Sequence, residues 1–246
     1  MSRRRVRAVT QKEVREFRRN RFVIGTMAVV PLVFLVTPMV TLFRIPASAN
    51  GAEVRGAVGS LSLLMLIIPL VIPPVIAAYS VVGERTQGTL EPVLSAPVTA
   101  SELLLGKALA AFVPSVGISY VVYFIAAISI RIGASHVVSG VVWHAPQLLA
   151  QILFTPLLAT WSIWVGIGIS TRASDVRVAQ QLATLAGLPL LAFTSLISFQ
   201  LITPSVPLAI GLAFALLAFD IAAWRVVSGL FDRERLITGR SHREAG

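Results

Sequence analysis

The sequence contains no cysteine and few charged residues. Without a thiol, the chain cannot form disulfides, use a thiolate nucleophile or hold a metal ion through cysteine. Only 13% of the 246 residues are charged, whereas 56% are hydrophobic and the mean hydropathy is +0.83. A soluble domain of this length needs more polar surface than this composition supplies. The composition therefore indicates a chain whose main solvent is lipid.

Motifs for binding ATP and for hydrolysis are also missing. The pattern G-x-x-x-x-G-K-[ST] does not occur, because the one Gly-Lys pair, Gly106-Lys107, is followed by Ala108 and has Ser101 at the first glycine position. Neither G-x-S-x-G nor H-E-x-x-H is present. We therefore expect a non-enzymatic chain that binds no ATP or other cofactor itself. A membrane-embedded enzyme is an alternative, and it would need convergent His, Asp or Ser residues.

The chain is strongly basic, with a formal charge of +10, but this excess does not indicate nucleic-acid binding. The basic residues lie at the two ends of the chain and between apolar runs, where membrane helices carry their flanking charges. His136 and His144 lie eight residues apart in a predicted outer loop, with no third ligand nearby. We expect them to be interfacial loop residues, and we expect no metal site.

Six apolar runs are long enough to cross a hydrocarbon core about 30 Å thick, which needs about 20 residues. Proline within such runs is tolerated, because neighbouring helices or water can satisfy the freed carbonyl groups. Pro73 and Pro74 are nevertheless expected to break or kink the second helix. The predicted fold class is an all-α polytopic membrane protein with one domain and about six transmembrane helices. The predicted spans are residues 22–43, 58–82, 108–130, 148–169, 181–202 and 206–228.

The basic residues predict the orientation of these helices. If residues 1–21 are cytoplasmic, 18 of the 21 basic residues lie on the cytoplasmic side and only Arg44, Arg55 and Arg131 lie outside. Both termini are therefore predicted to be cytoplasmic, in a multi-pass protein of a prokaryotic inner (cytoplasmic) membrane. A signal peptide cleaved at residues 47–49 is an alternative. The first run has 22 residues, against about 7–15 for a signal core, so an uncleaved helix is favoured.

Residues 1–21 are predicted to form an amphipathic helix in the membrane interface, and residues 229–246 a cytoplasmic tail. At about 100° per residue, apolar side chains share one arc and most basic side chains point elsewhere, although Glu13 lies within the apolar arc. Such a helix presents its basic face to lipid phosphates. The alternative is a basic flank without defined structure. The apolar arc consists of Val6, Val9, Val14 and Phe17.

The most informative segment is the predicted cytoplasmic loop 83–107. Thr89 can cap a short helix that carries an apolar stripe at positions i, i+3 and i+4, and Pro97 ends this helix. The stripe can either dock on a cytoplasmic partner or rest on the membrane surface. Thr99 and Glu102 then have the spacing of a capping box, which predicts that the third spanning helix begins near residue 100. The stripe consists of Leu90, Val93 and Leu94.

This loop resembles the first cytoplasmic loop of ABC-2-type transporter permeases. That family pairs an acidic residue, a Gly-Thr-Leu-Glu core, a proline after a small residue, and a Glu-Leu…Gly-Lys pattern at the start of the third helix. Weaker similarity extends to residues 12–19, 174–181 and 231–236. The matching loop positions are Glu84, Gly88, Thr89, Leu90, Glu91, Pro97, Glu102, Leu103, Gly106 and Lys107.

The resemblance implies a half-transporter that works with a separate ABC ATPase subunit. Residues 89–96 would lie in a groove of that ATPase, with polar contacts from Glu84, Arg85 and Glu91 at its rim. ATP and magnesium would be bound by the partner and not by this chain. The resemblance also implies export by alternating access, and a second permease that is either an identical copy or a paralogue.

Few polar residues lie within the predicted spans. Asp220 is the only acidic one, and it can either form a buried polar tie beside Arg225 or belong to a permeation path. Thr194 and Ser198 can line a cavity or pack against a neighbouring helix. An ion-coupled secondary transporter is the main alternative function. It predicts several ionisable residues at mid-membrane and related halves, whereas the sequence offers Asp220 and no visible repeat.

Overall fold

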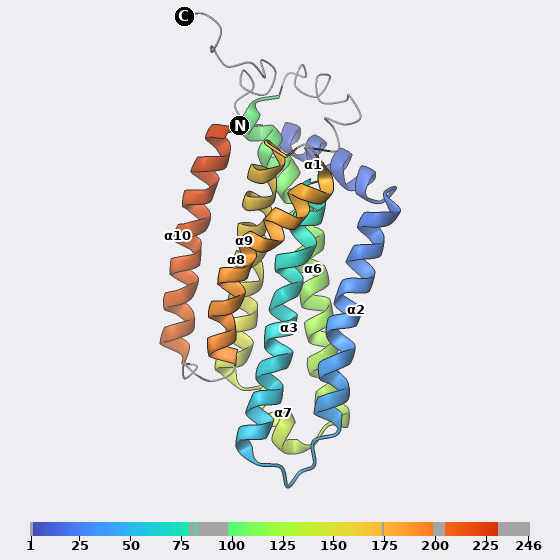
Figure 1. The fold of residues 1–246 in the computed structure, drawn as a ribbon, viewed down its shortest axis with the longest axis vertical. Helices are drawn as coiled ribbons and strands as arrows, with labels where there is room; N and C mark the ends of the chain where they lie inside the picture. The colour runs from blue at the N-terminus through green and yellow to red at the C-terminus, as the bar shows by residue number, and fades with distance from the viewer. Residues whose placement is uncertain (1, 79–81, 83–97, 174, 199–204, 231–246) are drawn as a thin grey trace, which may run out of the picture.

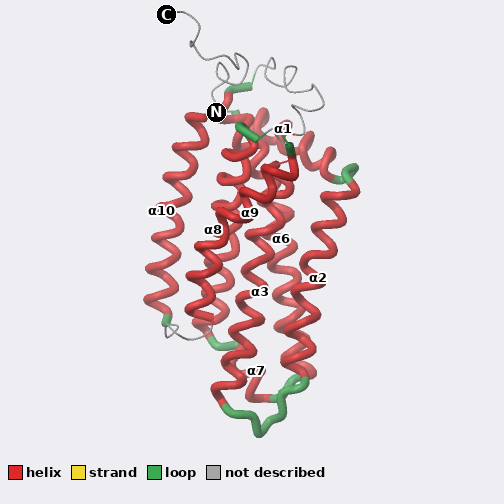
Figure 2. The backbone as a smooth tube through the Cα atoms, in the orientation of Figure 1, coloured by secondary structure: helices red, strands yellow, loops and turns green. Residues whose placement is uncertain are grey.

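The computed structural model describes residues 2–78, 82, 98–173, 175–198 and 205–230. Within these residues the chain consists of helices and loops, as Figure 2 shows. Six of the helices are long and apolar enough to cross a membrane. The predicted fold class, an all-α polytopic membrane protein, is therefore confirmed.

The six spanning helices run side by side as a bundle (Figure 1). A further helix, α1 (Arg3–Phe17), lies across the end of the bundle that we call the α1 end, and a short helix, α7 (His136–Val142), lies at the opposite end. The spanning helices are α2 (Arg21–Phe43), α3 (Gly51–Ala78), α6 (Ala100–Gly133), α8 (Ala145–Ser170), α9 (Val176–Ser198) and α10 (Val206–Leu230).

Helix α3 is the centre of the bundle, and it packs against α2, α6, α8 and α9. In its most apolar stretch 72% of the residues are buried, against 17% in α2 and in α9 and 11% in α10. The peripheral helices expose large apolar side chains, such as Val33 (57%), Leu185 (57%) and Phe214 (67%). Such surfaces are unfavourable in water but not in lipid, whose tails are as apolar as leucine.

The prolines of α3 do not break the helix. The expectation that Pro73 and Pro74 would break the second spanning helix is therefore wrong. Helix α3 continues without interruption from Gly51 through Pro73 and Pro74 to Ala78. A proline at 73 cannot donate to the carbonyl of residue 69, four positions earlier. The hydroxyl of Ser162, on α8, lies 3.0 Å from the Pro69 carbonyl oxygen and shares its one proton between this acceptor and the Ala159 carbonyl of its own helix, also at 3.0 Å. A neighbouring helix therefore supplies the hydrogen bond that proline removes, as lipid-embedded backbone requires.

Replacing Ser162 by alanine is expected to destabilise the bundle modestly. The substitution leaves the Pro69 carbonyl without this donor in a buried site, and interhelical hydrogen bonds in membranes contribute about 0.6–1.7 kcal/mol. Thermal unfolding of the detergent-purified protein should show a lower midpoint for Ser162→Ala. Thr160→Ala on the same helix is the control, because the Thr160 hydroxyl donates to its own helix at Pro156. Equal midpoints for the two variants would contradict the expectation.

Candidate functional site

The candidate site lies at the α1 end, where α1 packs on the first turns of α6. Helix α6 has 34 residues, so it is about 51 Å long and exceeds the hydrocarbon core by roughly 20 Å. Its first two turns, residues 100–107, carry Glu102 and Lys107 and precede the predicted span of residues 108–130. Helix α1 covers these turns with its apolar side, which includes Val9, Val14 and the buried Phe17.

The cap of α6 also binds the start of α1. The Thr99 hydroxyl accepts a hydrogen bond from the Glu102 amide at 3.3 Å, and the Glu102 carboxylate accepts one from the Thr99 amide at 3.0 Å. The second carboxylate oxygen accepts the Ser2 amide at 2.6 Å, and Arg5 lies 3.6 Å from the carboxylate. Hydrogen bonds from the backbone of Ser2 and Thr99 lower the pKa of Glu102 to about 2. Glu102 therefore stays ionised and ties the two helix starts together.

Gly106 allows the two helices to approach closely. The Thr10 hydroxyl donates to the Gly106 carbonyl at 3.1 Å. A Cβ atom at position 106 would lie 2.5 Å from Cγ1 of Val9 and 3.2 Å from the carbonyl oxygen of Val6. Only glycine fits at this crossing without displacing α1.

About one turn after Thr10 on α1, Glu13 forms a buried ion pair with Lys107 of α6. The Lys107 ammonium donates to the Glu13 carboxylate at 2.8 Å, and both side chains are within 1% of complete burial. This pair explains why an acidic residue lies on the apolar arc of α1. The helical pattern places Glu13 on this arc but does not predict its pairing with Lys107, because 94 residues separate the two. We call Glu102, Gly106 and the Glu13–Lys107 pair, with their contacts, the α1–α6 clamp.

The two ends of loop 83–97 are anchored at different places. Before the loop, Val82 is fully buried against Ala173 and Ala179, at the turn between α8 and α9. After the loop, Val98 packs on the main core, next to the α1–α6 clamp. The predicted ATPase-coupling residues themselves lie outside the described residues. These are Glu84, Arg85, Gly88, Thr89, Leu90, Glu91, Val93, Leu94 and Pro97.

The residues suggested for a permeation path do not come together. Besides a cavity of about 220 Å³ that it shares with Phe219, Thr194 lines a small cavity of about 40 Å³ near the α7 end, whereas Asp220, which is 96% buried on α10, lines neither. Ser198 ends α9, and its side chain lies outside the described residues. Among the described residues, no hydrogen bond or ion pair reaches the Asp220 carboxylate. The proposed tie to Arg225 is therefore not formed.

Sequence reasoning missed the polar residues that accompany Thr194. Gln147 and Gln151, one turn apart on α8, line this cavity with Ser62 of α3. Gln147 donates to the Ser62 hydroxyl, and Gln151 donates to Thr155 at 3.2 Å. Two amide side chains at i and i+4, at the start of an apolar run, were the available signal. The Gln147–Ser62 contact joins α8 to α3, and the Gln151–Thr155 contact lies within α8.

The comparison with family models gives one match, to the ABC-2 family transporter protein, over residues 7–221. The chain belongs to the ABC-2 transporter family. The matched region runs from α1 into α10 and includes loop 83–97 and, of the α1–α6 clamp, Glu13, Glu102, Gly106 and Lys107. A comparison with curated proteins gives no match. The resemblance deduced from the loop is thus confirmed at the level of the family.

Family membership makes this ABC-2 protein a multi-pass membrane protein and an ABC-type permease. Permeases of this family are non-catalytic membrane subunits that generally work with an ATPase subunit.

Proposed function

We propose that this permease exports its substrate by alternating access, driven by ATP hydrolysis in a separate nucleotide-binding subunit. ATP and magnesium bind to that subunit, and two permease halves, identical or paralogous, complete the transporter. The family match supports the permease role, and the 246 residues contain no P-loop motif that could cradle ATP phosphates. The excess of basic residues at the α1 end supports a cytoplasmic location of that end.

In this proposal the ATPase docks on loop 83–97. The stripe of Leu90, Val93 and Leu94 enters a groove of the ATPase, and Glu84, Arg85 and Glu91 contact the rim of that groove. A short helix with an apolar face is a common element for such docking.

The observation that carries the proposal is how firmly both ends of this loop are attached. Val82 is buried against the α8–α9 turn, and the chain after Val98 continues directly into the α1–α6 clamp. Packed helices change between discrete arrangements and do not deform continuously. A displacement of the loop by the ATPase would therefore move α6 together with α1, and would also act on α8 and α9.

The docking step is tested by charging the stripe. The triple variant Leu90→Asp, Val93→Asp, Leu94→Asp is expected to lower co-purification of the partner ATPase at least tenfold, because burying three carboxylates in an apolar groove is strongly unfavourable. Val137→Asp is the matched control, since Val137 is 39% exposed on α7, at the opposite end of the bundle.

The control must keep the ATPase bound, and both variants must reach the membrane in equal amounts. Retention of the ATPase by the triple variant would refute docking at loop 83–97. The family assignment would stand in that case, because it rests on the sequence match and not on the docking site.

A further inference from the structure

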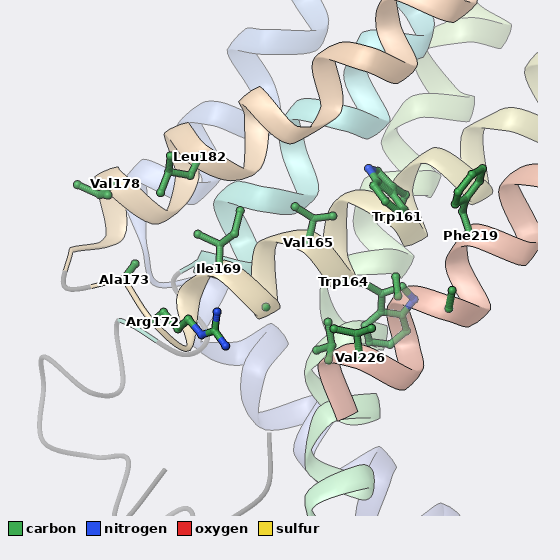
Figure 3. Close-up of a pocket in the computed structure, with 14 residues that line it drawn as sticks. Trp161, Trp164, Val165, Ile169, Arg172, Ala173, Val178, Leu182, Phe219 and Val226 are labelled. Carbon is green, nitrogen blue, oxygen red and sulfur yellow. The ribbon is translucent and has the colours of Figure 1, made fainter. Parts of the chain in front are cut away.

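A groove between α8, α9 and α10 has a volume of about 780 Å³. Figure 3 shows its walls: Trp161 and Val165 from α8, Leu182 from α9, and Phe219 from α10. Helices α9 and α10 each pack extensively on α8, but they make few contacts with each other in the described part of the chain. The groove is therefore open sideways, toward lipid.

The walls of the groove are fixed by aromatic contacts. Trp161 meets Phe219 edge to face with ring centroids 6.3 Å apart, and Trp164 meets Trp224 at 4.9 Å. Gly168 lets α8 and α10 approach closely at the groove, since a Cβ atom at position 168 would lie 3.2 Å from Cγ2 of Val227. The volume falls within the 300–1,000 Å³ that ligand pockets commonly have.

Charge is concentrated at one end of the groove. Among the described residues that line the groove, Arg172, just beyond the end of α8, is the only ionisable one, and the others are apolar, aromatic or glycine. Its side chain is exposed and forms no ion pair among the described residues, and Figure 3 shows its guanidinium beside the groove. A cationic mouth above an apolar slot matches an amphiphile with an anionic head.

The depth of the groove indicates what kind of amphiphile fits. Trp161 precedes Arg172 by 11 residues, which corresponds to about 16 Å along a helix. Half of a hydrocarbon core about 30 Å thick is about 15 Å. The groove therefore reaches from the membrane surface at the α1 end to the middle of the bilayer, which is the depth of one lipid leaflet.

We propose that the groove between α8, α9 and α10 binds an acyl chain of a glycerophospholipid with an anionic headgroup, whose phosphate is held by Arg172. Guanidinium groups bind phosphate through two parallel hydrogen bonds. Basic pockets between transmembrane helices on the cytoplasmic side are suited to acidic lipid headgroups. The lipid fills the wedge that α9 and α10 leave open, and it holds both helices against α8. The proposal concerns lipid binding alone and does not depend on the ATPase.

Bromine on the acyl chain quenches indole fluorescence on contact, so Trp161 and Trp164 report occupancy of the groove. The full chain, carrying Trp143→Phe to remove the exposed indole at the opposite end, is titrated in detergent with dibrominated phosphatidylglycerol or dibrominated phosphatidylcholine. The anionic lipid should quench with an apparent affinity at least fivefold higher. Arg172→Gln should abolish this difference, and Arg172→Lys should keep most of it.

Two controls separate the groove from the surface in general. Arg177→Gln removes an exposed positive charge close by that does not line the groove, and it should leave the fivefold preference intact. Ala222→Phe fills the groove from α10 and should lower quenching by both lipids. Native mass spectrometry gives a second readout: the wild-type chain should retain an anionic phospholipid that Arg172→Gln loses.

Three results would overturn the proposal. Equal quenching by the two lipids in the wild-type chain would show no selection of the headgroup. An equal loss of preference in Arg177→Gln would show attraction by surface charge alone. Unchanged quenching in Ala222→Phe, with no lipid retained by the wild-type chain, would show that the groove holds no acyl chain, as when a second permease copy covers it.

Discussion

Glu13→Gln is expected to lower the thermal unfolding midpoint of the purified protein by roughly 10 °C. The substitution removes the Glu13 carboxylate, which lies 2.8 Å from the buried Lys107 ammonium in the native protein. Removing one member of a buried ion pair costs about 3–5 kcal/mol. For a chain of this length, each kcal/mol shifts the midpoint by about 2–4 °C.

A neighbouring carboxylate provides the control for this experiment. Glu16, on the same helix, pairs with Lys12 at 3.1 Å but is 53% exposed, and exposed pairs contribute about 0–1 kcal/mol. Glu16→Gln should therefore leave the midpoint nearly unchanged. The double variant Glu13→Leu, Lys107→Met should recover most of the lost stability, since it removes both charges and keeps the volume.

The midpoints are measured by calorimetry or by the loss of a monodisperse chromatographic peak on heating. If Glu13→Gln and Glu16→Gln behave alike, the buried pair does not hold α1 on α6. The Glu13–Lys107 pair would then not be the contact through which a displacement of loop 83–97 and α6 moves α1.

Gly106→Ala is expected to displace α1 from α6 and to reduce ATP-driven transport more than tenfold. The new methyl group would lie 2.5 Å from Cγ1 and 2.6 Å from Cβ of Val9, and 3.2 Å from the Val6 carbonyl. Overpacking of this kind costs about 1–3 kcal/mol. Because the contact includes the backbone of α1, a change of rotamer at Val9 cannot relieve it, and the helix must move.

Gly117→Ala on the same helix is the matched control. A Cβ atom at position 117 meets nothing within 4 Å, and alanine favours a helix over glycine by about 1 kcal/mol. This variant should therefore transport normally and be slightly more stable. Val9→Ala should rescue Gly106→Ala only in part, since the Cβ of residue 9 remains in the way.

Transport is measured in vesicles that contain the permease and its ATPase, and the position of α1 by a crosslink between cysteines introduced at Arg3 and Leu109, which line one groove between α1 and α6. A normal crosslink and normal transport in Gly106→Ala would show that the close approach of the helices is unimportant.

Local features of the fold could be predicted from the sequence. The apolar runs predict six spanning helices because a helix satisfies its own backbone in lipid, whatever surrounds it. Thr99 and Glu102 form both hydrogen bonds of the capping box that their spacing predicts, and these bonds join residues three apart. The loop pattern was specific enough to indicate the ABC-2 family, which the family match confirms.

Features that depend on neighbouring helices could not be predicted. The prolines of α3 do not break the helix because Ser162, 93 residues away in the chain, supplies a hydrogen bond to the Pro69 carbonyl. Arg225 does not pair with Asp220 in the described part of the chain, and residues five apart on a helix lie about 140° apart around its axis.

The sequence by itself determined the solvent, the class of fold and the family of this protein, because hydrophobicity, helix length and short motifs act over a few residues. Only the tertiary structure decided that Glu13 pairs with Lys107, that Gly106 lets α1 cross α6, and that Arg172 stands above an apolar groove. These contacts join helices that are distant in the chain, so they depend on how the helices pack, and no local pattern encodes that packing.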